Sequence, residues 1–262
     1  MGASFRICRM FGVPVEINAS WGIVFLLLTF LLSQEFGDSK LGWPVAQRWT
    51  VAGALTIFFS LSILTHELSH SILAKRQGIP VESITLFIFG GVSRLSREPD
   101  GPWQEFIIAV IGPVSSLLLA GIFGVAWYLI GQGDSTLDVI LFLLAWSNLS
   151  LGVFNLLPGY PLDGGRVLRA AIWGLTGNHR KANRVAARCG QVLGATAVIL
   201  GIIIGLKLEP IDGIWIGIVG GFLFSVATAG LLDAKSGNDE PEIEGAAQPQ
   251  DAQASQPGPR LD

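Results

Sequence analysis

Apolar residues are grouped in six long segments along the chain, and polar or turn-forming residues separate them. The segments cover residues 18–33, 51–74, 104–130, 137–157, 189–206 and 213–232. A helix needs about 20 apolar residues to cross the hydrocarbon core of a bilayer. The first segment is marginal by this criterion, and the other five are long enough. The pattern therefore predicts an all-α polytopic membrane protein with about six transmembrane helices.

The pattern changes at the C-terminal end of the chain. From Ala234 onward, Gly, Asn, Asp, Glu, Pro, Gln and Ser replace the apolar runs. Such a composition cannot bury enough apolar surface to fold. We therefore predict a six-span domain over residues 1–233 and a disordered, polar and acidic tail over residues 234–262.

A different pattern interrupts the chain between the second and third predicted spans, at residues 78–101. The run from Val81 to Phe89 is β-branched and aromatic, and Gly90 and Gly91 follow it directly. Such a run is typical of strands, and the glycines allow a turn. We predict a small membrane-embedded β hairpin or sheet here, with a short interfacial loop as the alternative.

Composition agrees with a membrane protein. Half of the residues are hydrophobic and 14% are charged, and the mean hydropathy is +0.55. A net charge of −3 gives no reason to expect a nucleic-acid partner. The expected environment is the lipid bilayer.

The positions of the basic residues predict an orientation. Fourteen of the 17 lysines and arginines lie at the two ends of the chain or in the loops after the second and fourth spans. The other three, Lys40, Arg48 and Lys207, belong to the opposite side. Because loops rich in Lys and Arg stay in the cytoplasm, both termini are predicted to be cytoplasmic, in the plasma membrane of a prokaryote.

The second predicted span contains a sequence that binds zinc in many hydrolases, H-E-x-x-H at residues 66–70. His66 and His70 are four residues apart, so a helix presents both on one face to a single ion. Glu67 is then close enough to reach a water molecule beside the metal and to act as a general base. Ionisable residues inside a membrane span are costly and mark functional sites. The alternative is that both imidazoles only hydrogen-bond the backbone of a helix bundle.

A catalytic zinc ion takes three protein ligands, so one more is needed. A third histidine six residues after His70 is excluded because Arg76 occupies that position. Among the remaining carboxylates, Asp163 follows directly on an apolar span on the cytoplasmic side. Pro158 and Pro161 end the preceding helix, which allows irregular backbone to direct this carboxylate towards the histidines. The alternative is that Asp163 only caps the next helix.

His66-Glu67-x-x-His70 and the stretch Asn155-x-x-Pro158 … Leu162-Asp163-Gly164 together resemble the site-2 protease family of intramembrane zinc metalloproteases. The resemblance covers residues 7–232 and rests on two motifs in the right order, each attached to a span. It implies that His66, His70 and Asp163 bind one zinc ion per chain and that Glu67 is catalytic. It also implies that Asn155 holds the substrate or stabilises the oxyanion.

The family also gives the predicted β element a role, because its members extend the substrate against a membrane-embedded strand. The residues implied in substrate binding are Phe89, Gly90, Gly91 and Val92. No insertion is long enough for a PDZ domain and the tail is too short for a CBS pair, so neither module is expected.

The expected function is hydrolysis of a peptide bond in or near the transmembrane segment of a membrane-anchored protein substrate. The alternative is a non-proteolytic zinc-binding scaffold or transporter of the same fold. A soluble-type zinc hydrolase tethered to the membrane is excluded because the motif lies within a span. Self-association into a homo-oligomer is left open by the sequence.

Overall fold

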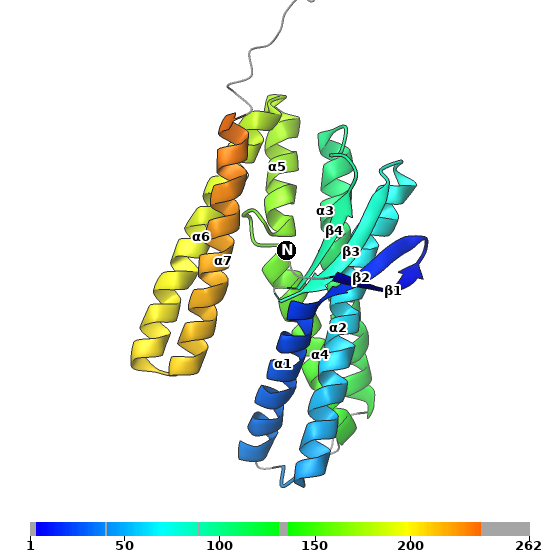
Figure 1. Ribbon diagram of the computed structural model, residues 1–262, viewed down its shortest axis with the longest axis vertical. Coiled ribbons are helices and arrows are strands. Elements are labelled where there is room, and N and C mark those ends of the chain that lie inside the picture. Colours follow the sequence, from blue (N-terminus) through cyan, green and yellow to red (C-terminus); the bar gives the residue numbers. More distant parts are fainter. Residues whose placement is uncertain (1–3, 40, 89, 131–135, 237–262) are drawn as a thin grey trace, which may run out of the picture.

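Helices make up most of the computed structural model (Figure 1), which describes residues 4–39, 41–88, 90–130 and 136–236. Seven helices and four strands are present in these residues. In chain order they are β1 (Ser4–Met10), β2 (Val13–Asn18), α1 (Ala19–Asp38), α2 (Val45–Arg76), β3 (Val81–Phe87), β4 (Gly90–Leu95), α3 (Pro102–Ile130), α4 (Thr136–Asn155), α5 (Asp163–Thr176), α6 (His179–Lys207) and α7 (Pro210–Ser236).

Six of these helices, all except the short α5, are long and apolar enough to cross a membrane. This confirms the six predicted spans, although α2 begins at Val45 and α6 at His179, several residues before the predicted starts. Large apolar side chains such as Leu26, Leu118 and Ile202 stay exposed on the outer surfaces of these helices. Because such surfaces are stable in contact with lipid chains, the protein is an integral membrane protein. The predicted tail lies, from residue 237 onward, outside the described residues.

The four strands form one sheet in the order β1-β2-β3-β4. The predicted hairpin is present as the antiparallel pair β3–β4, and Phe89 between these strands lies outside the described residues. The sequence did not predict β1 and β2, which form a second antiparallel hairpin around Phe11 and Gly12, both with positive φ. The two hairpins join through a parallel β2–β3 pair, in which Val15 lies opposite Ile84.

The sheet packs on the second half of α2. Val13 of β2 and Ile84 of β3 form a buried cluster with Leu68, which lies inside the H-E-x-x-H segment of α2. A neighbouring cluster of Ala74, Ile79 and Ile108 joins the end of α2 to α3. Because apolar burial holds both the sheet and α3 on this part of α2, the motif lies between them (Figure 1).

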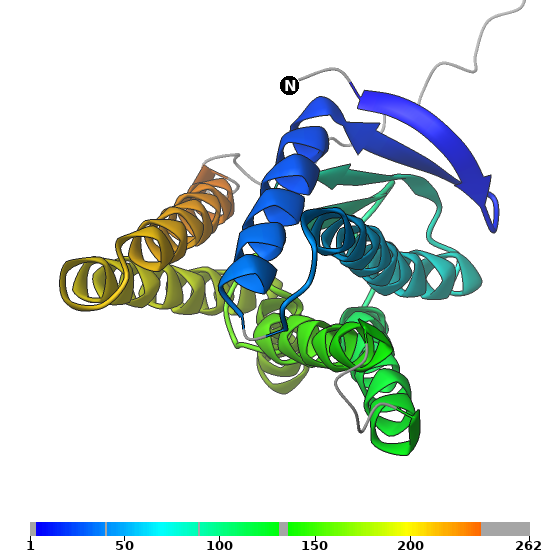
Figure 2. The ribbon, with the colours of Figure 1, turned by 90° about the horizontal axis from the view of Figure 1, so that it is seen from below.

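Helices α6 and α7 form a closely packed pair to one side of the other helices (Figure 2). A Cβ atom on Gly194 or Gly201 would lie 2.6 Å from a backbone nitrogen of α7, so only glycine allows this approach. A hydrogen bond joins this pair to the turn before α5: the Tyr160 N–H donates to the carbonyl of Ala186 on α6 at 3.1 Å. The turn that precedes Asp163 therefore rests on α6.

Candidate metal centre and cavity

Two helices from distant parts of the chain bring His66, His70 and Asp163 together. Nε2 of His66 lies 2.9 Å and Nε2 of His70 lies 3.1 Å from Oδ2 of Asp163. The candidate ligand atoms of the three residues all lie within 4.8 Å of one another. Both histidines are 3% exposed and Asp163 is 9% exposed. Two imidazoles and a carboxylate thus converge in a buried site.

The outward-facing nitrogens of both imidazoles are held by α3. Nδ1 of His70 lies 2.5 Å from the carbonyl oxygen of Ile108, and Nδ1 of His66 lies 2.9 Å from Oγ of Ser116. A carbonyl oxygen only accepts hydrogen bonds, so Nδ1 of His70 donates its proton there. Such a partner is typical of metal-binding histidines, because it fixes the ring and its tautomer.

This hydrogen bond determines what His70 presents to Asp163. A neutral imidazole protonated at Nδ1 has a lone pair at Nε2, and that lone pair faces a carboxylate oxygen at 3.1 Å. Two hydrogen-bond acceptors at this distance repel each other unless a proton or a metal ion lies between them. The donor set of two imidazoles and one carboxylate is one that zinc takes in catalytic sites. The residues therefore fit a zinc ion.

Glycine makes room for the cluster. A Cβ atom on Gly112 of α3 would lie 2.0 Å from Nε2 of His70 and 2.7 Å from Nε2 of His66. Backbone of α3 consequently forms the wall behind the two nitrogens. The close packing of α3 at Gly112 is therefore against the two histidines themselves.

The direction of the Asp163 carboxylate comes from the irregular turn over residues 156–162. Leu162 is the N-cap of α5, and Asp163 is its first helical residue. Gly164 and Gly165 let the turn fold back on α5, since Cβ atoms there would lie 2.3 Å from the backbone of Leu156 and Gly159. The carboxylate is directed at the imidazoles, so Asp163 does not serve as a plain helix cap.

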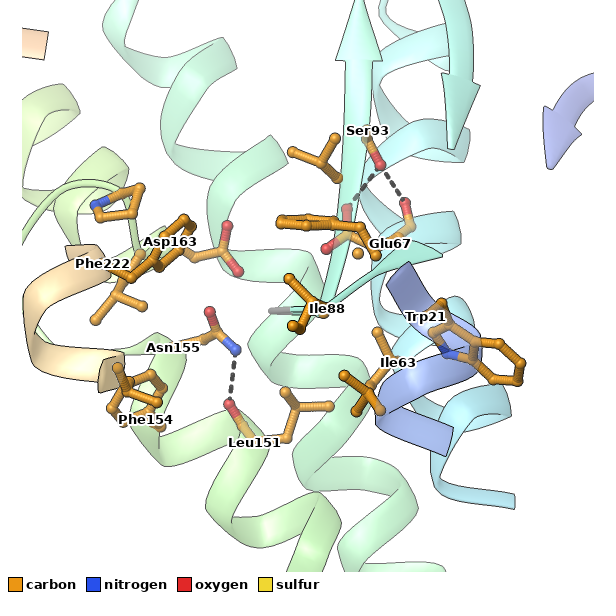
Figure 3. Close-up of a pocket in the computed structure, with 18 of the residues that line it drawn as sticks. Trp21, Ile63, Glu67, Ile88, Ser93, Leu151, Phe154, Asn155, Asp163 and Phe222 are labelled. Carbon is orange, nitrogen blue, oxygen red and sulfur yellow. Dashed lines mark hydrogen bonds between the residues drawn. The ribbon is translucent and has the colours of Figure 1, made fainter. Parts of the chain in front are cut away.

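Glu67 lies beside the cluster but contacts a different element. Its Oε2 accepts a hydrogen bond from Oγ of Ser93 on β4 at 2.8 Å (Figure 3). Gly91, also on β4, packs on the same side chain, because a Cβ atom there would lie 2.5 Å from Cγ of Glu67. The carboxylate is therefore held between α2 and the sheet.

Asn155 ends α4 on the other side of the same space. Its Nδ2 donates to the Leu151 carbonyl at 3.0 Å (Figure 3). Asn155, Asp163 and Glu67 all line one cavity of about 750 Å³. The three polar groups therefore face a common volume.

Most of the cavity wall is apolar. It includes side chains of α1, α2, α4 and α7, among them Trp21, Ile63, Phe154 and Phe222 (Figure 3). Gly90, Gly91 and Val92 of β4 also line the cavity. They are three of the four residues predicted to bind substrate. The fourth, Phe89, lies outside the described residues.

Sequence reasoning missed three groups that support the site: Ser93, Ser116 and the carbonyl of Ile108. Each becomes a partner of the motif only through the packing of β4 or α3 against α2. A serine or a backbone carbonyl has no distinctive spacing in sequence. The one available signal was that Ser93 lies two residues after Gly91, within the predicted hairpin.

The fold and the site define a polytopic membrane protein with a buried cluster of two histidines and an aspartate that could hold a metal ion, next to a glutamate. Residues 54–133 and 130–200 match peptidase family M50, and both motifs lie in these ranges. The chain belongs to this family, which confirms the resemblance to site-2 proteases.

Known proteins resemble the chain over most of its length. A protein of Synechocystis sp. that is named as a zinc metalloprotease is 37% identical over 241 residues, which cover 90% of this chain and 62% of the relative. The Rip3 protein of Mycobacterium tuberculosis, also named as a zinc metalloprotease, is 36% identical over 84% of this chain and 56% of its own length. The chain thus spans about three fifths of the curated relatives it matches.

A solved structure has the same fold. The site-2 protease from Methanocaldococcus jannaschii superimposes with a TM-score of 0.62 and 27% sequence identity, over 87% of this chain and 95% of that one. The arrangement of spans and sheet is therefore shared with a solved member of the family.

Proposed function

We propose that this protein is an intramembrane zinc metalloprotease that hydrolyses a peptide bond in or near the transmembrane segment of a membrane-anchored protein. One observation carries the proposal: His66, His70 and Asp163 converge next to Glu67 at a cavity walled by membrane-spanning helices. Family membership and the names of the relatives support the same activity. The cleavage would be a step of regulated intramembrane proteolysis.

One zinc ion per chain would be held by His66, His70 and Asp163. When bound there, zinc supplies Lewis-acid chemistry, which polarises a carbonyl oxygen and makes water more acidic. Ile108 and Ser116 keep both imidazoles oriented for this task through their Nδ1 atoms.

Glu67 would serve as general base and then as general acid. Its carboxylate would accept a proton from the attacking water and later deliver it to the nitrogen of the departing amine. Glu67 follows His66 directly and lines the cavity with Asp163, so it is near the ligands without belonging to the cluster of three. This placement suits proton transfer at the scissile bond.

Asn155 would bind the oxygen of the scissile carbonyl. Nδ2 of its side chain is a neutral donor that has a second proton besides the one given to Leu151. As negative charge develops on the substrate oxygen, such a donor stabilises it. Asn155 and residues of β4 line the same cavity, which has room for a substrate segment.

The substrate would extend along β4. This strand is at the end of the sheet order, so its outer edge has no partner among the described strands. A transmembrane helix hides its peptide bonds, and pairing with a free strand edge exposes them. Gly90, Gly91 and Val92 line the cavity along this edge, and we assign Phe89 to the same substrate-binding stretch.

The membrane orientation follows from the charges. Fourteen of the 17 lysines and arginines fall on the side proposed as cytoplasmic. Both termini would therefore be in the cytoplasm of a prokaryotic cell, and the product would leave the plasma membrane on that side.

A reconstituted cleavage assay tests the activity. The protein is placed in proteoliposomes with a tagged single-span reporter whose transmembrane segment contains Gly and Pro, and the products are separated by size. Glu67→Gln should abolish cleavage while zinc content stays at one ion per chain. Glu82→Gln changes an exposed glutamate on β3 and should cleave normally. Cleavage by Glu67→Gln at the wild-type rate would refute the proposal, and zinc flux without cleavage would favour a transporter.

A further inference from the structure

Two serines outside the predicted site form a chain of hydrogen bonds that ends on Glu67. Oγ of Ser71 donates to Oγ of Ser93 at 3.1 Å, and Oγ of Ser93 donates to Oε2 of Glu67 at 2.8 Å. We propose that Ser93 is a positioning residue that holds the carboxylate of Glu67 in place for proton transfer. This inference rests on the proposed protease activity and goes beyond it by assigning a role to β4 in the chemistry.

The chemistry of the three groups determines which of them donates in each hydrogen bond. An ionised carboxylate only accepts hydrogen bonds, and each hydroxyl has a single proton to donate. Ser93 therefore gives its proton to Glu67, and its oxygen accepts the proton of Ser71. Ser71 is 0% exposed, so its hydroxyl does not turn to water. A hydrogen bond to a charged acceptor is about twice as strong as a neutral one.

The backbone of β4 reinforces this contact. Alternate residues of a strand face the same side, and Gly91 and Ser93 both face Glu67. The missing side chain of Gly91 lets the strand approach Cγ of Glu67, while Oγ of Ser93 lies near both its carboxylate and its carbonyl oxygen, the latter at 3.2 Å. Two residues of one strand thus restrict the rotation of a single side chain.

The outer edge of the same strand pairs with no other strand in the described part of the chain, and residues of this strand line the cavity. A substrate paired with that edge would be in register with β4, and β4 is in fixed contact with Glu67 through Ser93 (Figure 3). The scissile bond and the base would consequently be placed by one element. General bases lose much of their effect when they are misplaced by about 1 Å, so this shared support has a direct kinetic consequence.

Removal of the Ser93 hydroxyl should therefore act on turnover. Ser93→Ala leaves the zinc ligands and the strand edge unchanged but frees the Glu67 side chain. We expect kcat to fall about 10- to 100-fold, the effect of one charge-assisted hydrogen bond. KM and zinc content should stay within twofold of wild type. Ser93→Thr, which keeps a hydroxyl, should restore most of kcat.

The test measures kcat, KM and zinc content in proteoliposomes with the single-span reporter for Ser93→Ala and Ser93→Thr. Ser83→Ala is the matched control, because it removes a buried hydroxyl of β3 that is not among the residues lining the cavity with Glu67, and it should behave as wild type. Unchanged kcat in Ser93→Ala overturns the inference. So does a loss that is accompanied by loss of zinc, or one that Ser93→Thr fails to restore, because either shows a purely structural role.

The Glu67→Gln variant separates this inference from the proposed function. If Glu67→Gln is inactive and Ser93→Ala is fully active, the protease function stands and the role of Ser93 is refuted. If Glu67→Gln cleaves as wild type does, the protease function fails, and the inference about Ser93 fails with it.

Discussion

Nε2 of His66 and Oδ2 of Asp163 lie 2.9 Å apart although 97 positions separate the two residues in the chain. One belongs to α2, and the other begins α5. The helix α3 lies against both, since it holds the imidazoles through Ile108 and Ser116 and gives the site its glycine wall. The candidate metal centre is thus a junction of three helices.

Gly112→Ala should weaken zinc binding. The new methyl group would lie 2.0 Å from Nε2 of His70, so the ring or α3 must shift. Overpacking of this kind costs about 1–3 kcal/mol, which corresponds to about 5- to 150-fold in affinity. Zinc content after dialysis against a chelator measures the effect.

Gly121 of the same helix is the control for Gly112. A Cβ atom there meets nothing within 4 Å, so Gly121→Ala should retain zinc as wild type does. Equal zinc retention by both variants would show that α3 does not form the wall of the metal site.

Ser116→Ala should lower zinc affinity by about 10- to 100-fold. Its hydroxyl is the partner of Nδ1 of His66, and loss of such a partner of a metal-binding histidine has this effect. Competition with a fluorescent chelator measures the affinity. Ser115→Ala, which removes a hydroxyl bonded to the carbonyl of Gly112 on its own helix, should change it little. A Ser116→Ala affinity equal to wild type would count against a role for this hydrogen bond.

Replacement of Arg169 alone should strongly destabilise the fold. Arg169 of α5 forms an ion pair with Glu105 of α3, which is 0% exposed, and its Nη1 donates to Oδ1 of Asn183 on α6 at 2.9 Å. Arg169→Met leaves a buried carboxylate without its partner, at a cost of about 3–5 kcal/mol. Denaturant unfolding in detergent micelles measures the free energy of unfolding.

The double variant Glu105→Leu with Arg169→Met tests the cause of that loss. It removes both charges, so most of the stability should return. A double variant as unstable as Arg169→Met would mean that packing of the arginine, and not the unpaired carboxylate, determines the effect.

Cys8 reports the orientation of the protein in the membrane. It is an exposed free cysteine on β1, on the side proposed as cytoplasmic. In a Cys189→Ser background, a membrane-impermeant maleimide should label Cys8 in inside-out vesicles and not in right-side-out vesicles. A cysteine introduced by Leu208→Cys, at an exposed position between α6 and α7, should show the opposite result. Labelling of Cys8 from the outside would reverse the proposed topology.

Local sequence patterns predicted the spans and the H-E-x-x-H motif, because both depend on residues close together in the chain. The strands β1 and β2 escaped prediction for a physical reason. The alternation of β1 is broken by a bulge between Arg6 and Cys8, and β2 finds its second partner, β3, only beyond two spans. From sequence alone, residues 4–18 cannot be distinguished from a polar segment that precedes the first span.

The site shows the same division. The pair His66 and His70 was predictable from helix periodicity, and Asp163 from its place after a broken span. The hydrogen bonds of Ser116 and Ser93 to the motif form only in one rotational orientation of α3 and β4 about α2. That rotation is set by the burial of many apolar side chains together, which no short stretch of sequence encodes.

The parallel pairing of β2 with β3 sets an order for biogenesis. The chain leaves the ribosome from its N-terminus, so β1 and β2 appear before α1 and α2, whereas β3 and β4 appear after them. The sheet closes only once two spans have entered the bilayer, and Asp163 arrives two spans later still. A nascent chain that already exposes His66, Glu67 and His70 therefore lacks its third candidate metal ligand until α5 begins.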